Sequence, residues 1–352
     1  MSETNFDKCH SCNHFSGSTE SCKEGLDPCT CERELAEPNP YKKYKKSLNN
    51  YTVFEDNLER LFVNKEMNIV YSSSAALESI YPHKLISQHI LSDIYHTKLD
   101  KIDFSKKWIA NLCSQKGCMM YCKFCKYPDV NFLGNVDLYE LNHQLNTILR
   151  NVSIDDFSAQ YYDNEGRFIP STDELDIYFS IMGEPTFNND ILIFTEYNLR
   201  KIVNYYINAK RIHPVLTTNL PKDNSELIPF LLRWCNIKNK VYEGEADLQF
   251  NLHSTSNTQR NELFDERSLT IEEISKIAAV LPKPIGKKYI LNFNYNSDTI
   301  IDINIINQLF DKNNWIIRIE KDVFSSEWDD SFFDILKLVN NCGWDIEIDW
   351  RF

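Results

Sequence analysis

Hydrophobic and polar positions follow two different patterns on either side of residue 107. Beyond it, short apolar runs alternate with longer stretches in which apolar residues recur every three or four positions. The strand-like runs fall at 107–114, 175–182, 214–219, 246–253, 288–295, 315–319 and 344–349. The helix-like stretches fall at 136–150, 194–210, 224–236, 270–281, 301–312 and 330–341. This alternation predicts an α/β fold of parallel units, in which six β-α units form an incomplete (β/α) barrel.

Before residue 107 the apolar residues are sparser and suggest smaller parts. Leu58, Leu61 and Phe62 stand at helical spacing, as do apolar residues near 85–94, which predicts a small helical layer over 51–95. A Pro-Asn-Pro break at 38–40 precedes it. We therefore predict three parts. They are a Cys-rich metal-binding module at 1–36, a linker with the helical accessory layer at 37–106, and the partial barrel at 107–352.

Composition narrows the class of protein. Of the 352 residues, 42% are hydrophobic and 25% charged, as in a soluble globular protein. No apolar run approaches the ~20 residues of a membrane span, and the N-terminus lacks a secretory layout, so we expect a cytoplasmic protein without a membrane partner. The net charge of −13 argues against a large RNA substrate, because RNA-binding proteins usually carry a basic face. The lysine-rich stretch 41–46 is either a solvated linker or an RNA-binding strip.

The cysteines indicate metal binding. There are eleven, an odd number, grouped in short clusters that fit metal ligation in a reducing compartment better than disulfides. Cys118, Cys122 and Cys125 place three thiols within one short loop. Such a loop can hold three corners of a [4Fe–4S] cluster and leave the fourth iron open for a ligand. The alternative is a zinc knuckle or structural thiols, but zinc prefers four closed ligands.

The segment Ser114-Gln-Lys-Gly-Cys-Met-Met-Tyr-Cys-Lys-Phe124-Cys resembles the signature of the radical S-adenosylmethionine (SAM) enzymes, which have an aromatic residue before the last cysteine. More narrowly it resembles the adenine-methylating radical SAM enzymes of ribosomal and transfer RNA. Their Gly-Asn helix start has its counterpart at Gly134-Asn135-Val-Asp137. The resemblance implies a cluster on the three cysteines, SAM as a second cofactor and an external one-electron reductant. It also implies cleavage of SAM to a 5′-deoxyadenosyl radical.

Further motifs follow in the order of that family. A Gly-Glu-Pro turn comes after the second strand, an Asn-x-His run with a later Arg260 ends the fourth, and an Asn follows the fifth. Thr217 and Thr218 end the third strand, where they either contact the ribose or are a plain strand terminus. His253 either faces the ligand or is a strand-end histidine bonded to backbone. The cofactor-binding residues predicted in this way are Phe124, Gly183, Glu184, Thr218, Asn251, His253 and Asn296.

The sequence departs from that family at its two methyl-carrying cysteines. Asn111 stands where the family has a cysteine before the cluster, and the nearby Cys113 aligns with a serine. The printed chain ends at Phe352, before the place of the family's C-terminal Ala-Cys-Gly loop. Cys342 lies in a helix-to-strand turn, where a buried or capping thiol is expected. We therefore expect radical formation without the family's methyl transfer.

The N-terminal cysteines predict a second metal site. A segment this short cannot bury enough apolar surface to fold alone, so a metal is a natural staple. The candidate ligands are Cys9, Cys12 and Cys22, with Cys29 or Cys31 as the fourth. Zinc is the favoured occupant, an auxiliary iron–sulfur cluster is the alternative, and unliganded thiols are the third reading.

These observations leave several functions open. The favoured one is a radical SAM enzyme that modifies a nucleobase or RNA. A peptide substrate is allowed by the N-terminal module, and a small metabolite is favoured by the acidic charge. The alternative from another class is a catalytically inactive, metal-dependent binding protein.

Overall fold

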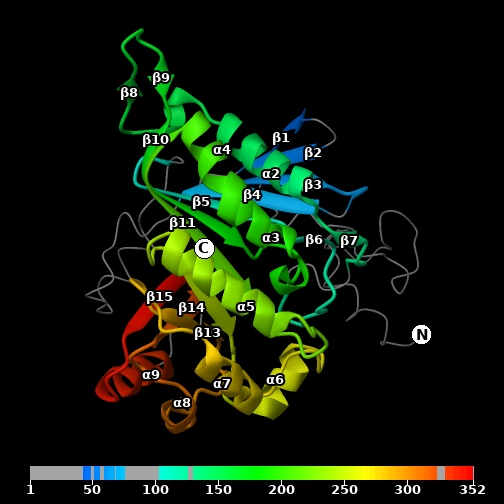
Figure 1. Cartoon of the computed structure of the whole chain (residues 1–352), viewed down its shortest axis with the longest axis vertical. Coiled ribbons are helices and arrows are strands. Elements are labelled where there is room, and N and C mark those ends of the chain that lie inside the picture. Colours follow the sequence, from blue (N-terminus) through cyan, green and yellow to red (C-terminus); the bar gives the residue numbers. More distant parts are fainter. Residues whose placement is uncertain are drawn as a thin grey trace, which may run out of the picture.

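The computed structural model describes residues 43–48, 51–55, 59–67, 69–75, 103–125, 130–322 and 330–351 (Figure 1). The predicted Cys-rich module, with Cys9, Cys12, Cys22, Cys29 and Cys31, lies outside these residues, so its metal stays a prediction. The same holds for 76–95 of the predicted helical layer. In the part of the chain that is described, no helix is long and apolar enough to cross a membrane.

One eleven-stranded sheet organises the chain, in the order β1-β2-β3-β4-β5-β10-β11-β12-β13-β14-β15. From β5 to β15 every neighbouring pair is parallel, whereas β1 to β5 pair antiparallel. The strands are β1 (Lys43–Leu48), β2 (Tyr51–Glu55), β3 (Glu59–Asn64), β4 (Ile69–Ala75), β5 (Lys107–Leu112), β10 (Ser171–Phe179), β11 (Asn208–Thr218), β12 (Asp247–Asn251), β13 (Tyr289–Tyr295), β14 (Trp315–Asp322) and β15 (Ile346–Arg351). Two small ribbons pair β6 (Gln115–Lys116) with β7 (Gly134–Asn135) and β8 (Tyr161–Tyr162) with β9 (Phe168–Ile169).

Helices connect the parallel strands and pack on one face of the sheet. They are α2 (Leu138–Arg150), α3 (Asp190–Ile193), α4 (Leu199–Tyr206), α5 (Leu227–Asn236), α6 (Asn257–Leu263), α7 (Ile271–Val280), α8 (Ile303–Leu309) and α9 (Asp330–Asn341). Short 3₁₀ helices η3 (Ile154–Asp156) and η4 (Pro185–Phe187) and π-helical turns η5 (Phe194–Asn198) and η6 (Ile237–Val241) complete them. On β10, Leu175, Ile177 and Phe179 belong to the helix-covered core, and the Phe179 ring meets Phe194 and Trp234 edge-on.

The sequence pattern beyond residue 107 corresponds well to these elements. Each strand-like run overlaps a strand, and each helix-like stretch overlaps a helix. The α/β class and a large, mostly parallel sheet are therefore confirmed, while the division into six barrel units stays a prediction. The short helix α6 was not predicted.

The predicted helical layer is wrong over its described part. Residues 51–75 form strands β2, β3 and β4, which extend the sheet as an antiparallel meander. Both faces of β3 and β4 are covered, since five of six residues of β3 are buried in succession. Phe62 stacks on Tyr71 across them at 4.8 Å. A continuous buried run has no alternation, so it cannot be told from a buried helix by periodicity.

Polar contacts fasten this meander to the parallel sheet. The Trp108 indole donates to Ser73 Oγ at 2.7 Å, which joins β5 to β4. Arg60 on β3 makes a buried bidentate pair with Asp156 in η3, at 2.7 and 2.9 Å. Paired in this way, a buried guanidinium and carboxylate satisfy each other.

Candidate functional site

The three cysteines of the predicted cluster lie on the loop that follows β5 and β6. The loop is at the carboxyl end of β5, the edge of a parallel sheet where ligands usually bind. It starts at Gly117, whose φ is +80°, and a Cβ there would lie 2.0 Å from the Asn131 carbonyl oxygen. Only glycine fits this close approach. A short turn thus brings Cys118, Cys122 and Cys125 together.

The thiols border a small apolar cluster that includes Met120 and Phe264. Burial raises the pKa of Cys118 to about 12, and the Met120 N–H, 3.4 Å from its Sγ, offsets only part of that effect. Burial also raises the pKa of Cys122, with further repulsion from Cys118, Cys125 and Glu184. Such thiols give up their protons when a bound metal supplies the positive charge. The donor set and its setting therefore fit a [4Fe–4S] cluster held on three sides.

The turn at Gly183 and Glu184 packs directly beneath this loop. Gly183 has φ +93°, and a Cβ there would lie 2.5 Å from Ser114 Oγ and 2.6 Å from Gln115 N. The Ser114 backbone N–H donates to the Met182 carbonyl at 2.9 Å. The glycine of the Gly-Glu-Pro motif is thus required by backbone packing, independently of any ligand.

Gln115 joins three of the sequence motifs. Its Oε1 accepts from the Glu184 N–H at 2.9 Å, and its Nε2 donates to Asn135 Oδ1 at 2.9 Å. Asn135 in turn donates to the Phe187 carbonyl at 2.8 Å. The Ser-Gln, Gly-Asn and Gly-Glu-Pro segments are therefore one hydrogen-bonded unit.

The Glu184 carboxylate is fully buried and already has protein donors. Its Oε1 accepts from the Thr218 hydroxyl at 2.6 Å and from the Thr186 hydroxyl at 2.7 Å, and its Oε2 accepts from the Asn219 N–H at 2.8 Å. Burial outweighs these donors and raises the pKa of Glu184. A carboxylate has about four acceptor positions, so Oε2 keeps room for one further hydrogen. The contact of Glu184 with the SAM ammonium stays a prediction.

The Thr218 hydroxyl both donates and accepts a hydrogen bond. Besides donating to Glu184, its Oγ1 accepts from the Leu220 N–H at 3.0 Å. The half-buried Thr217, which donates to Gln249 Oε1 at 3.1 Å, faces the opposite side of the sheet. Of the two threonines, Thr217 is the better placed for a ligand.

An aromatic cluster surrounds the end of the cysteine loop. The His253 ring stacks on Phe264 with centroids 5.6 Å apart and meets Phe124 edge-on at 4.7 Å. His253 Nδ1 accepts from the Asn294 N–H at 3.0 Å, so the neutral ring carries its proton on Nε2. The structure thus brings the predicted residues Phe124 and His253 into contact.

Helix α6 and the turn after it clasp the cysteine loop, and pattern reasoning missed this. The Lys123 N–H donates to the Leu263 carbonyl at 2.9 Å, and Arg267 donates to the Met119 carbonyl at 3.2 Å. The Arg267 guanidinium also lies 4.7 Å from the centre of the Tyr121 ring. The sequence feature that indicates helix α6 is Ser256-x-x-Gln259, because Ser256 Oγ accepts from the Gln259 N–H as the N-cap.

Arg260, the arginine of the predicted Asn-x-His motif, holds the carboxyl end of β12. It is buried and donates to the carbonyls of Leu252 and Leu269 and to Ser268 Oγ. These contacts fix the backbone around His253, which has φ +54°. Its position is that of a support for the loop.

Backbone strain gathers at this edge. Six non-glycine residues have positive φ in the ranges that the structure describes. Five of them border the cysteine loop or its clasp: Tyr121, Leu220, His253, Asp265 and Glu266. Each such conformation costs of order 1–3 kcal/mol and persists only where surrounding contacts enforce it.

Asn251 and Asn296 are placed very differently. Asn251 is half-buried at the end of β12, where it donates to Asn219 Oδ1 at 2.7 Å and accepts from Asn292 Nδ2 at 3.0 Å. Asn296 is exposed in the turn after β13, and its Oδ1 accepts from the Asp298 N–H at 3.0 Å. The structure gives Asn296 a local turn contact, and its approach to SAM stays a prediction.

Among the described residues, Cys113 and Cys342 are the other cysteines that the family comparison singled out, and both lie outside the cysteine loop. Cys113 is buried and donates to the Gln115 carbonyl at 2.6 Å, and burial raises its pKa to about 12. Asn111 donates to Ser72 Oγ at 3.0 Å. Cys342 lies between α9 and β15, near the amino end of that strand, whereas the cysteine loop lies at the carboxyl end of β5. The absence of a methyl-carrying cysteine stays a prediction.

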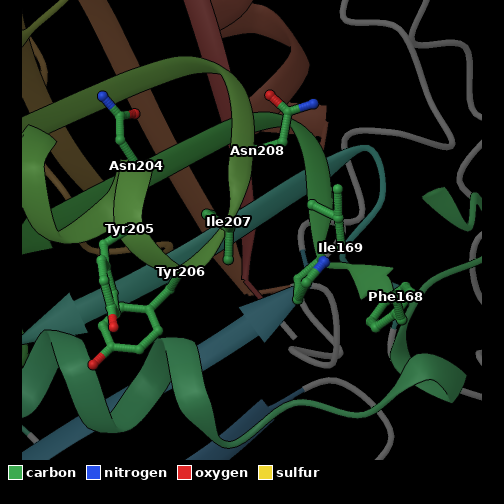
Figure 2. Close-up of a pocket in the computed structure, with 8 residues that line it drawn as sticks. Phe168, Ile169, Asn204, Tyr205, Tyr206, Ile207 and Asn208 are labelled. Carbon is green, nitrogen blue, oxygen red and sulfur yellow. The ribbon is translucent and has the colours of Figure 1, made fainter. Parts of the chain in front are cut away.

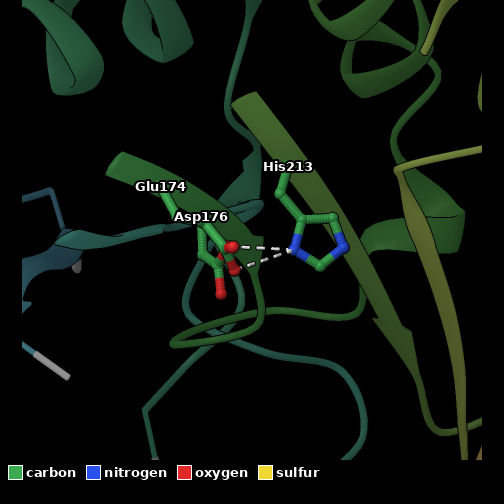
Figure 3. A group of neighbouring side chains, drawn as sticks. All are labelled: Glu174, Asp176 and His213. Atoms are coloured by element: carbon green, nitrogen blue, oxygen red, sulfur yellow. Dashed lines mark hydrogen bonds and ion pairs between the residues drawn. The ribbon is translucent and has the colours of Figure 1, made fainter. Parts of the chain in front are cut away.

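Two other features lie away from this edge. Glu174, Asp176 and His213 come close enough to suggest a metal site (Figure 3). Lys107, however, stands 3.1 Å from Asp176 Oδ2 and 3.4 Å from Glu174 Oε1, so a lysine already supplies the cation. A hollow of about 460 Å³ beside Phe168 and Tyr205 (Figure 2) lies at the starts of β10 and β11, away from the cysteines.

No family model and no curated protein matches the sequence. Among solved structures, the fold is similar to a radical SAM methyltransferase from Sphaerobacter thermophilus. The two share 12% identity over 88% of this chain and 77% of that one, with a TM-score of 0.46. It is also similar to Streptococcus suis SuiB bound to S-adenosylmethionine, with 14% identity over 71% of this chain and 48% of that one and a TM-score of 0.41. These scores are low, so the assignment of function depends on the residues of this chain.

Proposed function

We propose that this protein is a radical SAM enzyme whose cluster is held by Cys118, Cys122 and Cys125. The observation that carries this is the trio of thiols on one loop, buried at Cys122 and partly buried at Cys118 and Cys125, at the carboxyl edge of a parallel sheet. When bound, a [4Fe–4S] cluster with SAM would supply the one-electron cleavage that yields a 5′-deoxyadenosyl radical.

The chain's own residues would position and shield this chemistry. Gly183 lets the backbone turn approach closely, and Glu184 Oε2 offers its remaining acceptor position to an ammonium. Phe124 and Phe264 pack around His253, and Cys125 borders the same apolar cluster as Phe264. Thr217 and Asn251 present polar groups on the side of the sheet away from the helices.

For the substrate we propose a nucleobase, free or in RNA. Within the described part of the chain, Gln249 Nε2 and Asn292 Oδ1 are buried without a hydrogen-bond partner. They supply one donor and one acceptor on neighbouring strands, and amide side chains are the usual readers of adenine edges. A small metabolite is the competing substrate, because the net charge of −13 disfavours long polyanions.

The test is anaerobic reconstitution with iron and sulfide, followed by dithionite and SAM, with 5′-deoxyadenosine as the measured product. The Cys122→Ala protein should lose both the cluster and the product. Cys235→Ala is the matched control, because Cys235 is a buried thiol on α5, and it should keep both. A protein that forms a SAM-responsive cluster but yields no 5′-deoxyadenosine would contradict the catalytic proposal.

For the N-terminal cysteines we propose a structural zinc site in a reducing, cytoplasmic setting. Elemental analysis of the full chain should give about one zinc per chain, lost in a Cys9→Ser, Cys12→Ser variant. Iron well above about four per chain, lost in the same variant, would instead indicate an auxiliary cluster.

A further inference from the structure

A row of amide side chains runs from the cysteine loop across four neighbouring strands. Asn219 Nδ2 lies 3.7 Å from Cys122 Sγ, and Asn219 Oδ1 accepts from Asn251 Nδ2 at 2.7 Å. Asn251 Oδ1 accepts from Asn292 Nδ2 at 3.0 Å, and the same Nδ2 donates to Glu320 Oε1 at 2.8 Å. We call Asn219, Asn251, Asn292 and Glu320 the amide row.

The carboxylate at the far end fixes the direction of every bond in the row. Glu320 can only accept when ionised, so Asn292 must turn its NH₂ group toward it. The second hydrogen of that NH₂ then faces Asn251 Oδ1, which sends the Asn251 NH₂ group to Asn219. Reversing all three amides would set Asn292 Oδ1 against Glu320 Oε1, two acceptors in repulsion. The donor that faces the Cys122 sulfur therefore follows from the chemistry of the row.

We propose that Asn219 is a positioning residue that donates a hydrogen bond to the Cys122 thiolate when this cysteine binds the cluster. The amide row keeps that donor aimed at the sulfur. This inference rests on the proposed function, because it concerns the cluster held by the cysteine loop.

The expected consequence is electronic. A hydrogen bond to a ligand sulfur draws negative charge from the cluster and raises its reduction potential, since the reduced form carries one more negative charge. Asn251 and Asn292 act one step removed, by holding the Asn219 amide in its orientation. Because Asn251 and Asn292 are already held on packed strands, they lose little conformational freedom when they hold the Asn219 amide.

The row can be tested without disturbing the backbone contacts of Asn219. Its N–H donates to Glu184 Oε2 at 2.8 Å, and its carbonyl accepts from Ser268 Oγ at 2.7 Å. Neither contact depends on the side chain. Asn219→Leu removes the whole amide. Asn219→Asp keeps an acceptor for Asn251 and, when ionised, cannot donate to sulfur.

The experiment is an EPR-monitored redox titration of the reconstituted full chain, without SAM. We expect a lower midpoint potential for both Asn219 variants, such that the ratio of reduced to oxidised cluster at a fixed solution potential falls about tenfold, or ~59 mV for one electron. Asn251→Leu should give a smaller fall in the same direction. Gln144→Leu, which removes a buried amide outside the row and outside the proposed binding site, should leave the potential unchanged.

The outcomes separate the two proposals. If the wild-type protein binds no cluster, the proposed function fails and takes the inference with it. If the cluster forms and both Asn219 variants keep the wild-type potential, only the inference is overturned. An equal fall in Gln144→Leu would also overturn it, because the effect would then come from general polarity. If Asn219→Leu assembles no cluster, the midpoint potential of Asn219→Asp decides the test.

Discussion

The two ends of the parallel strands solve the burial of polar groups in opposite ways. Strand β12 shows both, since its first residue, Asp247, belongs to an ionic group and its last, Asn251, to the amide row. At the amino end, His213 Nδ1 lies 2.9 Å from Asp176 Oδ1, and its Nε2 lies 3.2 Å from Asp247 Oδ1. Arg318 lies 3.8 Å from Asp247 and makes an ion pair with Glu347 at 2.7 Å. We call Asp176, His213, Asp247, Arg318 and Glu347 the ionic group.

The two ends differ in whether their buried polar groups already compensate one another. The ionic group contains its own cations and anions, and burial within it is compensated by charge pairing. The cysteine end holds neutral amides and protonated thiols, and its carboxylate at Glu184 is bound by hydroxyl and amide donors. Of the two ends, only the cysteine end therefore keeps donor groups that a bound metal could use.

The largest expected effect comes from breaking the ionic group. Asp247→Leu leaves the imidazolium of His213 and the guanidinium of Arg318 short of a buried counter-charge. Its free energy of unfolding should fall by ~3–5 kcal/mol. Asn251→Leu, on the same strand and face, should cost only ~1–3 kcal/mol, because neutral amides are left unpaired. Urea unfolding of the metal-free proteins measures both, and equal costs would refute the contrast.

The next effect is a pH dependence that belongs to the amino end. Burial disfavours the charged His213 ring, but Asp247 and Asp176 outweigh it and raise its pKa to about 9. The unfolded value is near 6.5, so this contribution is fully present below about pH 6.5 and is lost as the pH rises through 9. The wild-type protein should lose up to about 3 kcal/mol over that interval.

His213→Gln isolates this contribution from the thiols, which also titrate at high pH. The difference in unfolding free energy between wild type and variant should shrink between pH 6.5 and 9.5. A constant difference across that interval would show that His213 is not held as an imidazolium.

A smaller effect separates close packing from backbone strain at the cysteine end. In Gly183→Ala the residue keeps a φ of +93°, and its Cβ would lie 2.5–2.6 Å from Ser114 and Gln115. We expect the free energy of unfolding to fall by ~1–3 kcal/mol or more. Gly166→Ala has a φ of +77° with nothing within 4 Å of the added Cβ, so it carries the strain alone. Thermal or urea unfolding should show the larger loss for Gly183→Ala; the reverse order would contradict the close approach.

The smallest effect is local. Gln115→Leu removes the side-chain acceptor of the Glu184 N–H, at a cost of ~1–2 kcal/mol. Hydrogen exchange at the Glu184 amide should become faster. Gln144→Leu is the control, because Gln144 also bonds backbone atoms, those of Cys113, but not this turn. Its Glu184 amide should exchange as in the wild-type protein, and a rate unchanged by Gln115→Leu would remove Gln115 from the unit.

Much of the parallel sheet was predictable because its strands are short apolar runs separated by amphipathic helices. The position of the cysteine loop after β5 was predictable because Cys118, Cys122 and Cys125 directly follow the first strand-like run, whereas the cluster itself stays a proposal. Strands β3 and β4 were not, since residues such as Phe62, Val63 and Val70 are buried without alternation. Helix α6 was missed because its seven residues are mostly polar.

The links inside the site lay beyond sequence reasoning for a different reason. Asn219 and Cys122 are 97 positions apart, and Asn251 and Asn292 are 41 apart. No local pattern signals which amides will share a row, because that depends on the register of neighbouring strands. Thr218 shows the same limit, since its hydroxyl turned toward Glu184 and its neighbour Thr217 turned the other way.

The clasp on the cysteine loop has a consequence for biosynthesis. Arg267 and Met119, which it joins, are separated by 148 positions. At ~5–20 residues per second, a ribosome needs roughly 7–30 s to pass from one to the other. From residue 125 onward the nascent chain carries Cys118, Cys122 and Cys125, yet the segment that holds their loop is not complete until residue 267. Under the proposed function, iron and sulfide would therefore reach a fully formed site only after residue 267 has been translated.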